Sequence, residues 1–450
     1  MRSGGSGADP GRPVGRSWWP WLAGWTALGL IIRVASVLGR PHLALSGDAW
    51  YYHWAAIDLV DGKGFINPLT YSQHHVTQGA DFPPGFIFLL AAAALVGVKG
   101  VLAQRIWVCI VGSAGIVLVG LVGREIGGRR VGLIAALIVA VYPNIWISDG
   151  LAMSEAVSPI LVALILLTAY RFYRRPGISS AVWLGLSIGL AALTRDELSL
   201  LGLFIFAPLT LGDRTRPWPK RFGVFAAGVI AALLVVAPWV GYNLSRFQDP
   251  VFISSGLGVT LASNNCAATY SGHLEGYWYM PCAGAPPVAA PGADESVQGS
   301  IDQRFAMDYM KAHAGRLPVV LAARFGRAFG LYRPIEQLQL DAEFETRPFH
   351  WAEVALYGYY ALSVGAVAGA VILRRRRVPV LPILAVGATV VVSVLMTFGD
   401  TRYRTTWEIS LALLAAVAID RVWSAARPEP ATAFEAGPAP APALAEAAAG

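Results

Sequence analysis

Asp48 is the residue of this sequence best placed to act as a base. It follows Gly47 at the start of a predicted helix that ends near Gly62, and Tyr51 and Tyr52 lie one turn further on. The dipole at a helix start favours the ionised carboxylate, which is the form that a general base or a metal ligand needs. An ordinary helix cap would also place an aspartate here. Asp48 is therefore a candidate catalytic residue with a structural alternative.

Other ionisable residues stand at the ends of apolar segments. Glu155 precedes one such segment, where an unpaired carboxylate would be costly, so we expect a cationic, metal or substrate-hydroxyl partner. Arg195, Arg402 and Arg404 supply guanidinium forks suited to bidentate phosphate binding. The alternative for these arginines is an ion pair with a nearby carboxylate.

A divalent metal is suggested but not required by the sequence. His74 and His75 lie shortly before Asp81, and Asp48 and Glu155 could also be ligands. The spacing of these side chains matches no established ligand pattern.

Three cysteines are too few for a thiolate metal site, and Cys109 lies inside an apolar segment. Cys266 and Cys282 lie in a polar region and could form a disulfide if that region faces an oxidising compartment. The aromatic residues between them could stack on a sugar or pack a small core; they are Tyr270, Tyr277, Trp278 and Tyr279.

Composition makes this an all-α polytopic membrane protein. Of 450 residues, 55% are hydrophobic and 14% are charged, which is more apolar surface than a soluble core could bury. The net charge of +7 resides in short loops between apolar segments, where it orients a membrane protein, so we expect membrane lipids and no nucleic acid as partners. The first apolar run carries Arg33 and lacks a cleavage site, so we interpret it as a retained span.

Eleven apolar segments are candidate spans, and their loops predict the topology. Basic clusters should all be cytoplasmic, which requires one net crossing between Pro83 and Gly123; we therefore predict that Pro84–Val98 is re-entrant or interfacial, leaving ten spans with both termini cytoplasmic. A normal crossing of Pro84–Val98 is the alternative. The segments are 18–38, 84–98, 104–123, 131–147, 156–172, 180–193, 198–211, 222–242, 351–373, 378–397 and 407–422.

This topology gathers the ionisable loop residues on the outer face of a plasma membrane. The predicted regions are a disordered cytoplasmic N-terminus (1–17), a transmembrane module (18–242) whose large outer loop (39–82) carries interfacial helices, a small outer domain (243–350), C-terminal transmembrane helices (351–423) and a disordered Pro/Ala-rich cytoplasmic tail (424–450).

Taken in order, the motifs resemble the GT-C superfamily of polyprenyl-phosphate-sugar-dependent membrane glycosyltransferases, particularly its protein O-mannosyltransferase and aminoarabinose transferase branch. The resemblance spans most of residues 18–422. It rests on Gly47-Asp48 with Tyr51-Tyr52, Pro83-Pro84-Gly85, Tyr142-Pro143 leading to Ser154-Glu155, Leu193-Thr194-Arg195, Ala237-Pro238-Trp239 with Asn243, and Arg402-Tyr403-Arg404.

The resemblance implies a bundle of ten to eleven transmembrane helices and transfer of a sugar from a polyprenyl-phosphate donor to a protein, lipid or cell-envelope glycan on the extracytoplasmic face. Asp48 would be the general base, and Glu155 the second acidic residue, which in some members takes part in metal binding. Arg402 and Arg404 would contact the lipid phosphate, with Arg195 as a further candidate. The predicted cavity residues are Tyr51, Tyr52, Asp81, His74 and His75. Single displacement would invert the anomeric configuration.

Two departures suggest an unusual donor or acceptor. Tyr242 precedes Asn243 where an arginine is common, and Thr405, Thr406 and Glu408 stand where prolines often follow Arg-x-Arg. A transporter or lipid flippase is the alternative from a different class, and a non-catalytic envelope-assembly protein is a third. The absence of a visible repeat of halves argues against a transporter.

Overall fold

The computed structural model describes residues 17–426. Helices form almost all regular structure in this range, apart from one antiparallel bridge between Ile66 and Gln78. The disorder predicted for 1–17 and 424–450 falls almost entirely outside the described residues, although the last helix continues to Ala426 instead of ending near 423. The predicted all-α polytopic fold class is confirmed.

Six helical segments in residues 17–426 are long and apolar enough to cross a membrane. Their helices are α1 (Trp19–Leu38), α5 (Val101–Gly127), α8 (Ser158–Arg174), α11 (Trp218–Arg246), α16 (Phe349–Arg375) and α18 (Thr405–Ala426). Shorter apolar helices are α4 (Pro84–Leu95), α9 (Ile178–Ala192) and α17 (Leu381–Met396). The number of spans predicted from the sequence, ten to eleven, therefore includes segments that are too short to cross alone as straight helices.

Two predicted spans are interrupted. The segment 131–147 is divided into α6 (Arg129–Val141) and α7 (Pro143–Asp149), which meet at 59°. Tyr142 is extended at the bend because the proline ring that follows it disfavours helical backbone. The segment 198–211 consists of a 3₁₀ turn η2 (Asp196–Ser199), a π turn η3 (Gly202–Phe206) and α10 (Ala207–Leu211).

The helix α4 is short for a span. Its twelve residues rise about 18 Å, against a hydrocarbon core of about 30 Å. Pro83 caps its start, and Gly97, with φ of 92°, follows its end. It packs against α2 (Gly47–Val60). This length suits the predicted re-entrant or interfacial position, which stays a prediction.

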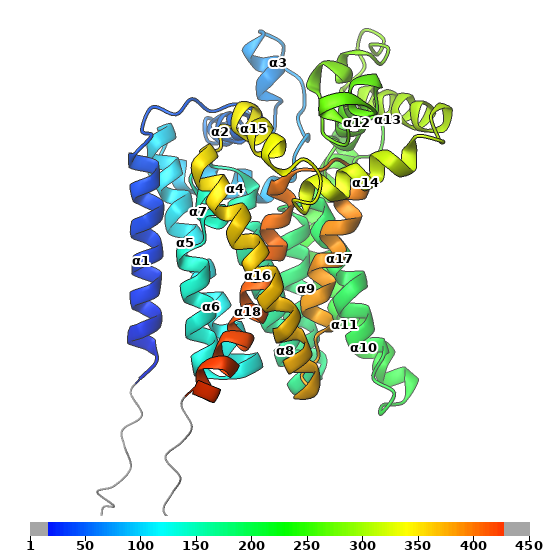
Figure 1. Cartoon of the computed structure of the whole chain (residues 1–450). Coiled ribbons are helices and arrows are strands. Elements are labelled where there is room, and N and C mark those ends of the chain that lie inside the picture. The colour runs from blue at the N-terminus through cyan, green and yellow to red at the C-terminus, as the bar shows by residue number, and fades with distance from the viewer. Residues whose placement is uncertain (1–16, 427–450) are drawn as a thin grey trace, which may run out of the picture.

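The bundle carries a layer of shorter elements at one end (Figure 1). These are α2 and α3 (Pro68–Ser72) from the first loop, and α12 (Leu257–Asn264), α13 (Glu295–Ala312), α14 (Leu317–Ala328) and α15 (Pro334–Glu345) from the polar region between α11 and α16. The start of α1 and the end of α18 lie at the opposite end. The main apolar core lies among α5, α6, α8, α9 and α16–α18.

Candidate functional site

Asp48 lies in the first turn of α2. Ser46 is extended and Gly47 has a φ of 51°, so the chain turns sharply into the helix. Tyr52 anchors the helix by packing edge-to-face against Phe86 of α4. The predicted helix and its end near Gly62 are confirmed, since α2 stops at Val60.

Arg402 is the cation that meets Asp48. It lies in the 3₁₀ turn η7 (Thr401–Arg404) before α18, and the Asp400 side chain caps this turn by accepting the Arg402 N–H at 2.9 Å. Nη1 of Arg402 lies 2.8 Å from Oδ2 of Asp48. Its Nε lies 3.2 Å from Glu345 Oε1 and 3.7 Å from Glu155 Oε1. One guanidinium thus joins carboxylates from α2, the start of the α8 segment and α15.

Arg195 supports Glu155 from the other side. Its Nη1 lies 2.5 Å from Glu155 Oε1, and its Nε lies 2.5 Å from Glu197 Oε1. The nearby carboxylates raise the pKa of Arg195 despite its burial. The ion-pair alternative considered for this arginine is therefore realised.

We call the group of Asp48, Glu155, Arg195, Glu345, Arg347, Asp400 and Arg402 the carboxylate–arginine cluster. Asp48 is its most open member, with 31% of its side chain exposed, against 12% for Arg402 and 5% for Glu155. A substrate that approaches the cluster would therefore meet Asp48 first.

Two members of the cluster carried no signal in the sequence. Glu345 ends α15 and Arg347 follows two residues later; both are buried, and Arg347 Nε lies 3.1 Å from Glu345 Oε2. The α15 sequence is that of an ordinary polar helix, so only the tertiary packing reveals the connection to Asp48.

Arg404 does not join the cluster. It is buried, its Nε lies 2.7 Å from Glu408 Oε1, and its guanidinium lies 4.0 Å from the centroid of the Tyr359 ring. Glu408 also accepts hydrogen bonds from Tyr142 at 3.1 Å and Asn144 at 2.8 Å. This packing does not favour the predicted phosphate contact by Arg404.

The remaining predicted cavity residues lie in two different environments, one buried and one exposed. Tyr51 and Tyr52 are buried against Phe82, and burial, followed by the charges of Asp48 and Glu155, raises the pKa of Tyr52. His74 and His75 are exposed in the loop after α3. The tyrosines therefore lie near the cluster, whereas neither histidine has a buried contact to it.

Asp81 pairs with a second carboxyl group. Nδ2 of Asn67 donates to Asp81 Oδ2 at 3.0 Å and to Glu295 Oε2 at 3.1 Å. Glu295 also accepts from Ser255 Oγ at 2.8 Å and from the N–H of Ala80. This pair connects the first loop to α13.

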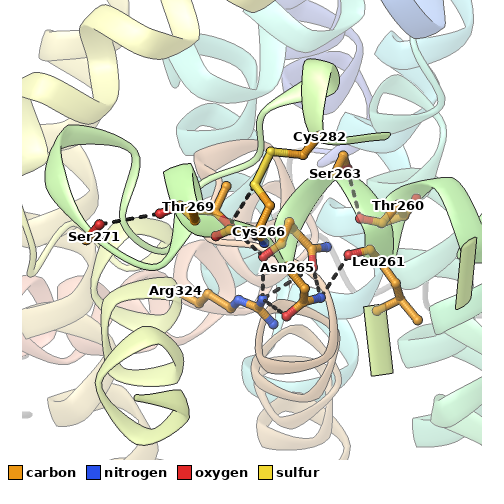
Figure 2. Close-up of a disulfide and its surroundings, with 11 residues drawn as sticks. Thr260, Leu261, Ser263, Asn265, Cys266, Thr269, Ser271, Cys282 and Arg324 are labelled. Carbon is orange, nitrogen blue, oxygen red and sulfur yellow. Dashed lines mark hydrogen bonds between the residues drawn. A yellow bond between two sulfur atoms is a disulfide. The ribbon is translucent and has the colours of Figure 1, made fainter. Parts of the chain in front are cut away.

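The cysteine region forms a small packed unit. Cys266 and Cys282 are joined by a disulfide (Figure 2). Tyr277 is buried and stacks on Trp278, with ring centroids 5.6 Å apart, and both pack near Phe344. This packing favours the core role of the aromatic residues over sugar stacking.

A metal does not fit the carboxylates that the sequence suggested. Within residues 17–426, no group of three or more His, Cys, Asp or Glu side chains is arranged to hold a metal ion. Asp48 and Glu155 instead face the same arginine.

Comparison with known proteins gives a family match and a shared fold. Residues 81–242, just over a third of the chain, match the profile of the dolichyl-phosphate-mannose-protein mannosyltransferase family. No curated protein sequence matches the chain significantly.

The Archaeoglobus fulgidus oligosaccharyltransferase has a similar fold. Its structure with a tethered acceptor peptide gives a TM-score of 0.58 at 15% identity, covering 92% of this chain and 50% of that one. Its complex with an inhibitory peptide and a dolichol-phosphate gives 0.56 at 14% identity, covering 91% and 51%. A further structure of that protein contains Zn and sulfate. The present chain thus spans about half the length of this relative.

ArnT from Cupriavidus metallidurans, bound to undecaprenyl phosphate, gives a TM-score of 0.45 at 14% identity, covering 90% of this chain and 79% of that one. Because this score is low, the shared fold rests on the oligosaccharyltransferase. Together with the family match, it confirms the resemblance to GT-C membrane glycosyltransferases that the motifs predicted.

Proposed function

We propose that this protein is a membrane glycosyltransferase that moves a sugar from a polyprenyl-phosphate donor to a hydroxyl or amine of a protein, lipid or cell-envelope glycan. The observation that carries the proposal is the ion pair between Arg402 and Asp48, which puts a candidate base and a candidate phosphate ligand in contact. The mannosyltransferase-family match and the fold shared with a protein solved with dolichol-phosphate support the donor class.

The reaction would be a single displacement. Asp48 takes the proton of the acceptor hydroxyl or amine while that atom forms a bond to the anomeric carbon. The bond between the anomeric carbon and the phosphate oxygen breaks, and the polyprenyl phosphate leaves with the electron pair. Attack from the opposite face inverts the anomeric configuration.

Arg402 would stabilise the charge on the leaving phosphate. Its guanidinium carries five N–H donors in a rigid fork, and the contacts of Nη1 and Nε with Asp48 and Glu345 leave further donors of the fork for a phosphate oxygen. Preorganised donors of this kind need no reorganisation during the reaction. Arg195 would act on Glu155, with which it pairs, and through it on Arg402.

We derive no step through a divalent metal. The carboxylates suggested as ligands, Asp48 and Glu155, are already neutralised by Arg402 and Arg195. The expected effect of chelation with EDTA is therefore no loss of transfer.

The arrangement of charge supports an extracytoplasmic site in a plasma membrane. Basic residues lie in the last turns of α5, α8 and α16; they are Arg124, Arg171, Arg174, Arg374 and Arg375. In Figure 1 these helix ends lie at the end of the bundle opposite α2 and α15. Because basic loops favour the cytoplasmic side, we place both termini inside and the carboxylate–arginine cluster outside.

The test is sugar transfer by purified protein reconstituted in lipid vesicles. Radiolabelled polyprenyl-phosphate mannose and polyprenyl-phosphate pentoses serve as donors, and extracted envelope glycans, lipids and proteins serve as acceptors. We expect D48N to lower transfer at least about 100-fold, whereas D61N, at the exposed end of the same helix, retains wild-type transfer. Undiminished transfer by folded D48N would overturn the role of Asp48, and movement of the labelled lipid across the vesicle without transfer would favour the transporter alternative.

A further inference from the structure

The turn between α15 and α16 points an acidic and a basic side chain, Glu345 and Arg347, into the carboxylate–arginine cluster. Burial, followed by the charge of Asp400, raises the pKa of Glu345 to about 8, and the arginines lower it. Glu345 and Arg347 are both buried, and Thr346 between them has a φ of 57°. A left-handed conformation is unfavourable for a β-branched residue, and such strain persists only where the surrounding contacts impose it. The surrounding contacts therefore hold this turn in one defined conformation.

The turn is held from two sides. Arg347 donates through Nη1 to Asn144 Oδ1 at 2.9 Å, and its Nη2 lies 3.4 Å from Ser148 Oγ, both on α7. Arg40, from the first loop, donates to the Thr346 carbonyl at 2.9 Å. The backbone that carries Glu345 is thus fixed against two elements that are distant in the sequence.

Glu345 links the fixed turn to Arg402, because it contacts both Arg347 and Arg402. Its Oε2 lies 3.1 Å from Arg347 Nε, and its Oε1 lies 3.2 Å from Arg402 Nε. This contact is an ion pair without a hydrogen bond, since neither Arg402 Nε nor Glu345 Oε1 has a hydrogen-bond partner among the described residues. Charge attraction to Glu345 therefore holds one side of the guanidinium while Nη1 meets Asp48. Without Glu345, the closest remaining carboxylate contacts of this Nε are Glu155 at 3.7 Å and Asp400 at 3.9 Å.

We propose that Glu345 is a positioning residue of the transfer reaction: anchored by Arg347, it orients the Arg402 guanidinium so that one side holds Asp48 and the other faces the donor phosphate. This role rests on the proposed glycosyltransferase function. Glu345 itself touches neither substrate nor reacting atoms.

The first experiment separates positioning from binding. We expect E345A to lower kcat about 10- to 100-fold, because small displacements of catalytic groups cost rates of this order, while the KM for the labelled polyprenyl-phosphate donor changes less than about threefold. E345Q, which keeps the size and one acceptor oxygen, loses less. E343A, which removes an exposed glutamate of the same helix, behaves like wild type. Unchanged kcat in folded E345A would overturn the proposal.

A double-mutant cycle tests whether Glu345 acts through Arg402. If it does, adding E345A to R402A lowers kcat no further than R402A alone. Multiplicative losses would mean that Glu345 supports the fold or the site by another route, and would overturn the proposed role. Melting temperatures of all four proteins identify variants that fail to fold.

A labelling experiment is independent of activity. Phenylglyoxal modifies accessible arginines, and mass spectrometry reports the rate at Arg402, whose side chain is 12% exposed. We expect faster labelling of Arg402 in E345A than in wild type and E343A, and equal rates would overturn the proposal. If wild type transfers no sugar, the proposed function fails while this result still tests the orientation of Arg402; if transfer depends on Asp48 but not on Glu345, only the positioning role fails.

Discussion

Nη1 of Arg402 and Oδ2 of Asp48 lie 2.8 Å apart, although 354 positions separate the two residues in the sequence. The contact joins the first turn of α2 to the turn that precedes α18. Residues near the two ends of the described chain therefore build the site together, and neither a fragment ending before η7 nor one starting after α2 would contain it.

The geometry of the guanidinium should matter more than its charge. A lysine at position 402 would keep the charge but could not hold Asp48 and Glu345 through two sides of one rigid plane. We expect R402K to lower kcat at least about tenfold, measured with the vesicle transfer assay. R421K, an exposed substitution near the end of α18, is the matched control, and wild-type turnover by R402K would show that charge alone suffices.

The roles of Arg402 and Arg404 differ because of the turn that carries them. In a 3₁₀ turn successive residues are about 120° apart, so residues two positions apart point in different directions. Arg402 faces Asp48, while Arg404 faces Glu408 and Ala328. The Arg-x-Arg pattern predicted both arginines as phosphate ligands because the sequence alone does not show which way each side chain points.

Removing Arg404 should therefore destabilise the protein without weakening donor binding. R404A leaves the buried Glu408 without its cation, and breaking such a pair costs about 3 kcal/mol, while the donor KM of the folded protein stays near the wild-type value. Thermal unfolding and steady-state kinetics measure the two effects, with R421A as the control. A large rise in donor KM at unchanged stability would restore the phosphate-binding role predicted from the sequence.

The sequence revealed the parts of the site that lie at recognisable helix starts. Asp48, Glu155 and Arg402 each precede or begin an apolar helix, where charge at a bilayer edge demands a partner. Glu345 and Arg347 escaped detection because their partners lie on α7 and η7, and pairing across such distances depends on how the helices pack. The spans at 131–147 and 198–211 were predicted as continuous because apolar composition alone does not reveal a bend or a π turn.

The Asp81–Glu295 pair should make stability depend on pH. Burial raises the pKa of Asp81 to about 6, and burial followed by the Asp81 charge raises the pKa of Glu295 to about 8. Two titratable groups face the pair from α2 and α11: the neutral hydroxyl of Tyr51, whose pKa is raised by burial, and the charged guanidinium of Arg246. Because these carboxyl pKa values are raised on folding, the pair's contribution to stability is present at acidic pH and is lost as the pH rises through about 6 and then about 8.

We therefore expect the melting temperature of wild type to fall between pH 5 and pH 9, and the fall to be smaller in E295Q, which keeps one member of the pair neutral. Other buried carboxyls, including Asp341, also have a raised pKa, so the difference between wild type and E295Q isolates the pair. D308N, an exposed substitution on the same helix α13, should retain the wild-type dependence. An E295Q profile parallel to that of wild type would contradict a contribution of this pair to the pH dependence.

The disulfide should stabilise the layer of shorter elements that supports Arg402. Cys266 and Cys282 close a loop of 16 positions, for which chain entropy gives about 3 kcal/mol. Figure 2 shows Arg324 beside this bridge, where Nη2 donates to Asn265 Oδ1 at 2.9 Å. Within the loop, the Gly276 carbonyl accepts the N–H of Gly399 at 2.8 Å, next to the turn that begins with Asp400. Loss of the disulfide would thus also loosen the segment that carries Arg402.

Reduction of the disulfide is expected to lower the melting temperature of wild type by several degrees, because the free energy of unfolding falls by about 3 kcal/mol. A double variant with C266S and C282S should melt at the lower temperature with or without reductant. If Gly399 transmits the effect to Asp400 and Arg402, the same variant also shows faster phenylglyoxal labelling of Arg402. A lower melting temperature with unchanged labelling would mean that the disulfide stabilises the protein but does not affect the orientation of Arg402.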